Sequence, residues 1–560
     1  MKSSQSSGSP RPSRALALLG SCIVAAGLIS GCGGGGGSTK ASDAVLRMGI
    51  SATIDSLNPF VSISDYSAVV YQYVYPQLVE YDTNNLSIQP SFATKWETSP
   101  DGLVWTFHTV PGAQWSDGQP LTAKDAAFTL TTTHQFQDGA TGKLGGFVRN
   151  LTSARATDDN TLVVTYSEPV ANVLAQMQQL PILPEHIWSQ YAAGDGKALS
   201  TFQNDAPIVS GGPFELQKYQ KDQLAIFDRN PKWWGPTAPK INGFGFQFFA
   251  NSDAMVTALR SNQVDMIGES TPATSVASLH EAGEQVNTAP GTGWYNLIIN
   301  TNPKKKDHHE LLNPEVRKAF EYAINRAEMV QTAWLGMATE GSTIVAPATG
   351  WHDDSIKGLP FDLAKANSIL DGLGYAKGPD GIRVADGVPM TYQVIFPNEI
   401  DGAGDRMFQI LQNDLREVGV GLEMRKMDTD AATAAINGPD NTYDTFDLAM
   451  WDWIPPVDPD FQLSVLTCDQ WGNNNDSGYC NPEYDKLYAA QAVARDHAER
   501  QRIINQMQQI AFDDRPYIAL VYQNVIEAHS PKWTGFLMSP LVGSVNNLST
   551  QTLMQVHPGA

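Results

Sequence analysis

Polar and apolar residues alternate in some stretches of this chain and recur at helical spacing in others. Residues 103–115, LVWTFHTVPGAQW, alternate as a half-buried strand does and then reach a Pro-Gly turn. An Asp-Gly turn follows, and then Thr122, with Asp125 three positions later as its partner in a capping box. The pattern predicts a strand, a turn and a helix in succession.

Further stretches have the spacing of amphipathic helices. The clearest runs from Pro314 to about Leu335, where Asn313 is suited to cap the helix and apolar residues fall on one face. The others cover roughly residues 363–373, 406–418 and 498–512. These helices alternate with strand-like segments such as YNLIINT and FDLAMW, which predicts α/β lobes with sheets flanked by helices.

Length and charge narrow the architecture and the partners. A chain of 560 residues exceeds the size at which one hydrophobic core stops growing, so we expect two or three lobes. The hydrophobic share of 42% is typical of a globular protein. A formal net charge of −22 argues against a nucleic-acid partner, because phosphate binding requires a basic face.

The first 31 residues have the composition of an export signal. Lys2, Arg11 and Arg14 form a cationic start, and the apolar run that follows is too short to span a membrane comfortably. The run ends in ISGC, which resembles the lipobox of bacterial lipoproteins, where the cysteine, here Cys32, becomes the lipidated N-terminus. We therefore expect a signal peptide over 1–31, a lipidated, glycine-rich tether over 32–42, and anchoring at the outer face of a cell membrane.

The remaining cysteines form one close pair. Cys32 is assigned to the lipid and Cys22 is removed with the signal, which leaves Cys468 and Cys480. A close pair in an exported protein predicts a disulfide bond. A metal site is the competing interpretation, but the residues between the two cysteines include no histidine and no C-x-x-C spacing.

Known catalytic signatures are missing from the sequence. It has no phosphate-binding loop of the usual spacing, no nucleophile elbow and no H-E-x-x-H helix. The stretch MWDWIPPVDPDF contains Asp452, Asp458 and Asp460, which could include a glycosidase-like acid and base. Aspartates beside prolines also form turns, and this second interpretation is favoured. We expect a protein that is not an enzyme and has no cofactor or metal site.

Several blocks, in this order, resemble the family 5 extracellular solute-binding proteins of ATP-binding cassette (ABC) importers. This family includes dipeptide-, oligopeptide- and nickel-binding lipoproteins. The most specific block is PSFATKWETSPDGLVWTFHTVPGAQWSDGQPLTAKDAAFTL at 90–130. The others are VSGGPFELQKYQ at 209–220 with RNPKWWG after it, NPEVRKAFEYAINRAEMV at 313–330 and SGYCNPEYDKL at 477–487. The resemblance extends over almost the whole chain after the signal.

The resemblance implies a periplasmic-binding-protein-like fold of type II. Two α/β lobes are joined by a two-stranded hinge, and the first lobe carries an inserted subdomain. We expect the first lobe at 43–294 with the subdomain at about 85–205, the second lobe at 295–520, and a return to the first lobe at 521–560. The implied mechanism is capture of a solute by a monomer, closure of the lobes, and delivery to a membrane permease.

The resemblance also indicates where a ligand binds. In peptide-binding relatives the segment that matches MWDWIPPVDPDF lines the cleft, and one aspartate pairs with the α-ammonium group of the peptide. That position is Pro455 here, so either Asp452 or Asp458 takes over or the ligand has no free amine. Trp451 and Trp453 supply flat apolar surfaces and, in an extended segment, point away from the side of Asp452. Weaker candidates for the cleft wall are Asn58, Trp294 and Tyr295.

A peptide-binding component of an importer is the leading hypothesis. In an alternative with the same transport mechanism, the ligand is an oligosaccharide, a nickel complex or another small solute. Two further alternatives belong to other functional classes. One is a surface sensor lipoprotein that has the same fold but no importer, and the other is a secreted hydrolase that uses the aspartates at 452–460 for catalysis. The net charge does not identify the ligand, since surface charge need not reach the cleft.

Overall fold

The computed structural model describes residues 44–400, 402–540 and 543–559. The expected signal peptide, the lipidation site at Cys32 and the glycine-rich tether lie outside these residues. The largest element is a mixed eleven-stranded sheet in the order β17-β16-β18-β12-β19-β11-β1-β10-β9-β8, with β13 paired to β19 off this path. Its strands are β1 (Val45–Ile50), β8 (Phe214–Gln220), β9 (Leu224–Arg229), β10 (Gly243–Phe248), β11 (Met266–Ile267), β12 (Gln285–Ile299), β13 (Ala338–Glu340), β16 (Thr391–Pro397), β17 (Gly421–Met427), β18 (Leu448–Trp453) and β19 (Tyr517–His529).

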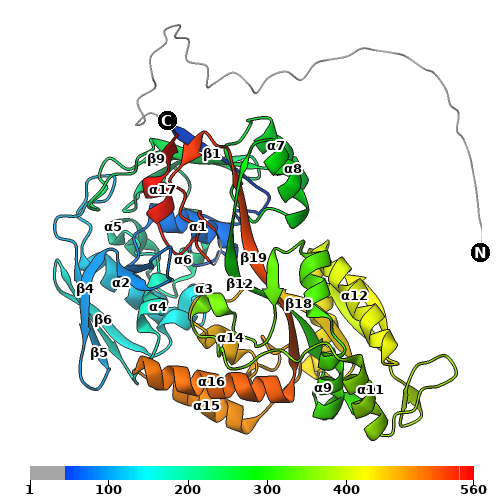
Figure 1. Ribbon diagram of the computed structural model, residues 1–560. Helices are drawn as coiled ribbons and strands as arrows, with labels where there is room; N and C mark the ends of the chain where they lie inside the picture. The colour runs from blue at the N-terminus through cyan, green and yellow to red at the C-terminus, as the bar shows by residue number, and fades with distance from the viewer. Residues whose placement is uncertain (1–43, 401, 541–542, 560) are drawn as a thin grey trace, which may run out of the picture. The chain divides into compact units, whose positions relative to one another are not determined.

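The two longest strands, β12 and β19, run side by side between the two parts of this sheet (Figure 1). They pair antiparallel, and their register shifts between Pro290 and Trp294. Toward one end Val286 and Ala528 pack in one hydrophobic cluster, and toward the other end Ile518 packs in a different one. The same two strands thus pass through separate cores, as a two-stranded crossing between lobes does.

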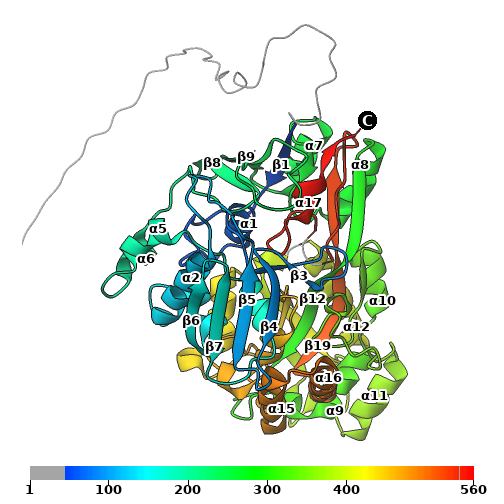
Figure 2. The ribbon, with the colours of Figure 1, turned by 90° about the vertical axis from the view of Figure 1, so that its left-hand side faces the viewer.

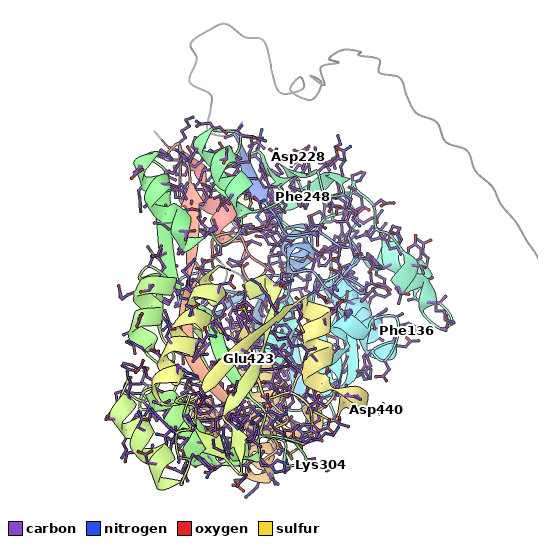
Figure 3. The ribbon with its side chains drawn as sticks, turned by 90° about the vertical axis from the view of Figure 1, so that its right-hand side faces the viewer. Phe136, Asp228, Phe248, Lys304, Glu423 and Asp440 are labelled. Carbon is purple, nitrogen blue, oxygen red and sulfur yellow. A yellow bond between two sulfur atoms is a disulfide. The ribbon has the colours of Figure 1, made fainter. Side chains whose placement is uncertain are left out.

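The first lobe is built on β1 and β8 to β11, and the second lobe on β16 to β18. Figure 3 labels Phe248 on β10 in the first lobe and Glu423 on β17, the edge strand of the second. Both faces of the second-lobe sheet are covered, because neighbouring residues such as Leu297 and Ile298 point into different clusters. One face packs against α9 (Pro314–Tyr322), α11 (Leu363–Gly372) and α12 (Ala403–Glu417), and the other against α13 (Thr429–Asn437), α15 (Pro482–Val493) and α16 (His497–Asp514).

A smaller antiparallel sheet of the order β4-β5-β7-β6 belongs to the first lobe and faces the viewer in Figure 2. Its strands are β4 (Ala93–Thr98), β5 (Val104–Thr109), β6 (Leu151–Asp158) and β7 (Thr161–Tyr166). Phe107 and Leu162 from this sheet pack in the same core cluster as Leu46 of β1. Helix α2 (Ala123–Gln135) lies against β6 and begins with the predicted capping box, in which Thr122 Oγ1 accepts from Lys124 N and Asp125 accepts from Thr122 N.

Short elements complete the two lobes. In the first lobe these are α1 (Asp65–Val74), β2 (Val79–Tyr81), β3 (Ile88–Pro90), α3 (Gly142–Gly145), α4 (Val173–Gln178), α5 (Glu185–Trp188), α6 (Lys197–Thr201), α7 (Ser252–Arg260), α8 (Val276–Glu281), β20 (Trp533–Thr534), α17 (Gln551–Gln555) and β21 (His557–Pro558). In the second they are α10 (Arg326–Glu328), β14 (Val384–Ala385), β15 (Val388–Pro389) and α14 (Asp460–Ser464). Across the described ranges, no helix combines the length and the apolar character needed to cross a membrane.

The predicted α/β class is confirmed, and one predicted helix differs. The expected helix over 314–335 ends at Tyr322, and a new short helix, α10, starts after Asn325. The side chain of Asn325 accepts a hydrogen bond from Glu328 N at 3.1 Å, so it caps a second helix and does not continue the first. A π-helical turn over 329–333 follows. The helices expected near 363, 406 and 498 are present as α11, α12 and α16.

Candidate functional site

A pocket of about 490 Å³ lies where β12 and β19 pass between the lobes. The first lobe contributes residues of α1 and the segment 545–548, the second lobe contributes residues 454–456, and the crossing strands supply 523–525. A larger hollow of about 640 Å³ is lined by residues between Tyr75 and Val209. Its walls come from the first lobe alone, so closing the two lobes does not enclose it. The pocket at the crossing is therefore the better candidate site.

The second lobe places Asp452 in this pocket. Asp452 lies on β18 opposite Tyr295 of β12, so the paired sheet fixes its backbone. Among the described residues, no side chain donates a hydrogen bond to its carboxylate or forms an ion pair with it. Burial, helped by repulsion from Glu399, raises the pKa of Asp452 to about 7. A cationic group that entered the pocket and approached this carboxylate would favour the ionised form.

The first lobe supplies two more carboxylates. Asp65 is the first residue of α1, and burial raises the pKa of its side chain. Glu269 accepts hydrogen bonds from Ser51 N at 3.0 Å, from Ser51 Oγ at 2.6 Å and from Ala52 N at 3.3 Å. These donors are neutral, so they orient the Glu269 carboxylate without cancelling its charge. Acidic groups thus line the pocket from both lobes.

The rest of the pocket is apolar or neutral and polar. Val69, Ile454 and Val525 provide apolar surface, while Gln523 and Asn524 provide amides. A pocket with apolar walls and a few placed polar groups is typical of small-molecule binding sites.

Two buried carboxylates hold the segment that forms one wall, residues 545–548. Glu527 of β19 accepts from the backbone N and the Oγ of Ser544, and burial raises the pKa of Glu527 to about 7. Glu80 accepts from the backbone N and Oγ1 of Thr550, both at 3.0 Å. The wall is therefore fixed at both ends by groups from other parts of the first lobe.

Of the predicted ligand contacts, Asp452 lines the pocket, and so does Pro455. Asp458 lies elsewhere: it forms a two-point ion pair with Arg500 and accepts from Asp460 N at 3.0 Å. Trp294 and Tyr295 are buried in the second-lobe core, where their rings contact the side chains of Tyr517 and Trp334.

The remaining predicted contacts also have structural roles. Asn58 is 1% exposed and donates to the carbonyls of Leu199 and Phe202 at 2.7 and 2.8 Å, which joins two segments of the first lobe. Trp451 and Trp453 are half-buried and pack against a second-lobe hydrophobic cluster, on the opposite side of β18 from the pocket. Their alternation with Asp452 follows the two-residue period of a strand.

The predicted disulfide bond is confirmed between Cys468 and Cys480, whose Cα atoms are 4.6 Å apart. It lies in the second lobe, outside the pocket lining. Within the described ranges, no group of three or more histidine, cysteine, aspartate or glutamate side chains is placed to hold a metal ion.

Sequence reasoning missed Asp65, Glu269 and the segment 545–548. Asp65 begins a helix whose start is marked by Ser64, but a cap signal does not say what the helix faces. Glu269 and the segment 545–548 lie in loops that no periodicity marks. Only the folded arrangement brings these segments to one pocket.

Two bacterial binding proteins are similar to this chain in sequence along most of its length. The chain is 25% identical over 510 residues to the dipeptide-binding protein of Escherichia coli K12, covering 87% of this chain and 91% of the relative. It is 24% identical over 532 residues to the glutathione-binding protein GsiB of the same strain, covering 93% and 96%.

Solved structures confirm the two-lobed fold. The periplasmic oligopeptide-binding protein of Thermotoga maritima superposes with a TM-score of 0.79 at 22% identity, over 92% of this chain and 99% of that one. NikA from Brucella suis, solved in complex with Fe(III)-EDTA, gives 0.78 at 20% identity, over 92% and 100%. These neighbours are periplasmic binding proteins of type II, so the expected fold class is confirmed.

The family described as bacterial extracellular solute-binding proteins, family 5 middle region, matches residues 87–474. This match spans well over half of the sequence and includes the second-lobe strand that carries Asp452. The chain therefore belongs to the family 5 extracellular solute-binding proteins, which bind solutes for transport and are not enzymes.

Proposed function

We propose that this protein is the extracytoplasmic binding component of an ABC importer that captures peptides between its two lobes and delivers them to the permease. The names of its relatives, a dipeptide-binding and a glutathione-binding protein, support a peptide-like solute. The pocket at the crossing strands has walls from both lobes, as a ligand that favours the closed form requires. In this proposal the first lobe comprises 43–294 and 521–560, the second comprises 295–520, and the protein acts as a monomer.

The observation that carries the peptide assignment is the carboxylate of Asp452. It lines the pocket without a donor among the described residues, and the side chain of Pro455 in the same wall has no polar group to hold an ammonium ion. We infer that Asp452 receives the α-ammonium group of the peptide. The apolar surfaces of Val69 and Ile454 then suit its side chains.

Calorimetric titration of the full-length chain tests this assignment. Trialanine is compared with N-acetyl-trialanine, and wild type is compared with Asp452→Asn. We expect acetylation to weaken wild-type binding by at least about tenfold and to have little effect on the variant. Asp430→Asn, which changes an exposed carboxylate of α13, is the matched control and should behave as wild type.

Other results would redirect the proposal. Equal affinity for the free and acetylated peptides would remove the role of Asp452. A response to a nickel–histidine complex or an oligosaccharide without any response to peptides would keep the transport role and replace the solute. Unchanged peptide uptake by cells that lack the protein would argue for a sensor without an importer.

We further propose that the chain is exported with the signal at 1–31 and anchored to the outer face of the cell membrane by a lipid on Cys32. The supporting observation is the ISGC ending of the apolar run, followed by the glycine-rich tether. Cells that express the wild type and Cys32→Ser are labelled with a radioactive fatty acid. Label and membrane association should be present in the wild type and absent from the variant; label on both proteins would contradict the assignment.

A further inference from the structure

The pocket between the lobes has an unbalanced set of charges. Its lining includes the carboxylates of Asp65, Glu269 and Asp452, and no lysine, arginine or histidine is among its described lining residues. Glu269 has neutral donors, and no described side chain pairs with Asp65 or Asp452. A solute that brought its own carboxylate into this pocket would meet three acidic side chains and no basic one.

The acidic groups are divided between the parts of the protein that move. Asp452 belongs to the second lobe, and Asp65 belongs to α1 of the first. Closure brings both lobes onto one solute, so it also gathers their negative charges in a space of low polarity, where repulsion is strong. A solute with a single cationic group would leave this lining with more acidic than basic groups.

Helix α1 presents one face to the pocket. Asp65, Val69 and Gln72 are spaced by four and three residues, so they share one face of the helix, and the first two line the pocket. Gln72 is 1% exposed, and neither its Oε1 nor its Nε2 has a hydrogen-bond partner. Gln72 is not among the described residues that line the pocket, so Asp65 and Val69 are the members of this face that a solute can contact.

We propose that the solute carries two separated cationic groups, one received by Asp452 on the second lobe and one by Asp65 on the first, and that it places no carboxylate in this pocket. For a peptide, the first group is the α-ammonium and the second is a lysine or arginine side chain. The two contacts favour the closed form because each lobe holds one end of the same dication.

This inference rests on the proposed function of the pocket, and the test separates the two. The full-length chain is titrated with alanyl-lysyl-alanine amide, alanyl-alanyl-lysine amide and the same peptides with norleucine in place of lysine. Norleucine keeps the length of the side chain and removes its charge. We expect at least one lysine peptide to bind at least about tenfold more tightly than its norleucine partner.

The variant Asp65→Asn assigns the second contact. Its lysine-to-norleucine affinity ratio should fall to about one, while Asp452→Asn should weaken both peptides and keep a ratio above one. A ratio measured within one variant is insensitive to any general loss of stability, and thermal melting confirms that each variant is folded. A ratio that persists in Asp65→Asn would overturn the assignment of this residue.

The outcomes distinguish the failure of each proposal. Equal binding of lysine and norleucine peptides would overturn the dication and leave the peptide function intact. If no peptide binds, 1,5-diaminopentane is titrated as a dication without a peptide group. Binding of this diamine that is lost in Asp65→Asn would uphold the dication and overturn the peptide function, and absence of binding would overturn both.

Discussion

Arg500 binds Asp458 through both of its terminal nitrogens, with Nη1–Oδ2 at 2.6 Å and Nη2–Oδ1 at 2.8 Å. The two side chains are 5% and 13% exposed, so the pair is largely removed from water. Arg500 belongs to α16, and Asp458 lies just before α14. The segment that follows β18 lines the pocket near its start. The ion pair therefore fixes the other end of this segment.

We predict that Asp458→Asn lowers stability without changing peptide affinity. The substitution removes the paired carboxylate of a buried guanidinium, which costs about 3–5 kcal/mol. Urea unfolding measures the loss of stability. Peptide titration at urea concentrations that leave the protein folded measures the affinity. Asp452→Asn should show the reverse pattern. An Asp458→Asn protein of normal stability that binds peptides poorly would identify Asp458 as a ligand contact instead.

The pKa of Asp452, raised to about 7 by burial and by Glu399, predicts a pH-dependent affinity. An ammonium ligand requires the ionised carboxylate, so affinity should fall by up to about tenfold for each pH unit below this pKa. Titrations between pH 5.5 and 8 measure the profile, with Asp452→Asn as the control because other buried carboxylates also titrate. A wild-type profile as flat as that of the variant would contradict the prediction.

The same raised pKa has a consequence for the protein without ligand. The folded state holds the proton of Asp452 more tightly than the unfolded chain does, because the unfolded value is 3.8. This group therefore stabilises the fold at low pH relative to high pH, and its contribution is lost as the pH rises from about 4 to about 7. Asp452→Asn should gain stability relative to wild type at pH 8, measured by thermal melting.

Local sequence signals predicted the helix starts whose capping residues lie within one helical turn. The capping box of Thr122 and Asp125 and the cap at Asp362 are set by residues within one turn, so the sequence was enough to place them. The helix from Pro314 was predicted to extend beyond its observed end, because its apolar spacing continues past Tyr322. There Asn325 begins a new helix, and the capping energy of one side chain outweighs the continuing pattern.

The candidate site was predictable only in part. Asp452 was predicted as a ligand contact from the resemblance of its segment to a known family. The alternation of side chains along β18 predicted which face of the strand it lies on. The first-lobe walls did not follow, because the contact between Glu80 and Thr550 joins residues 470 positions apart. A pocket made by such contacts has no local pattern, and its charge balance becomes visible only when Asp65 and Asp452 are brought to the same space.

We predict that the disulfide bond stabilises the second lobe and leaves binding unchanged. The bond between Cys468 and Cys480 closes a loop with a sequence separation of 12, which on the chain-entropy model contributes about 3 kcal/mol. Urea unfolding with and without a reductant measures the contribution, and the Cys468→Ser, Cys480→Ser double variant should no longer respond to the reductant. A loss of peptide affinity in the folded double variant would show that the loop also positions the pocket.

Arg495 connects the two lobes at a distance in sequence from the crossing strands. It lies between α15 and α16 of the second lobe, and its Nη1 donates to the carbonyl of Pro100 at 2.7 Å, in the turn between β4 and β5 of the first. Its Nη2 donates to the carbonyl of Ser99 at 3.4 Å. Close by in sequence, Ala492 O accepts from Ala171 N at 2.9 Å. These contacts join the lobes outside the crossing strands, so a separation of the lobes would break them.

We predict that Arg495→Ala shifts the lobes toward the open form. Hydrogen bonds to carbonyls at an exposed site contribute modestly, so peptide affinity should fall by about two- to tenfold, because the ligand must then supply more of the closing free energy. Small-angle X-ray scattering should show a larger radius of gyration without peptide and a wild-type value with saturating peptide. Arg502→Ala removes an exposed arginine of α16 that pairs with Glu499 one helical turn away, and it should match wild type in both measurements. An unchanged radius and affinity in Arg495→Ala would mean that the crossing strands and the ligand alone set the closed arrangement.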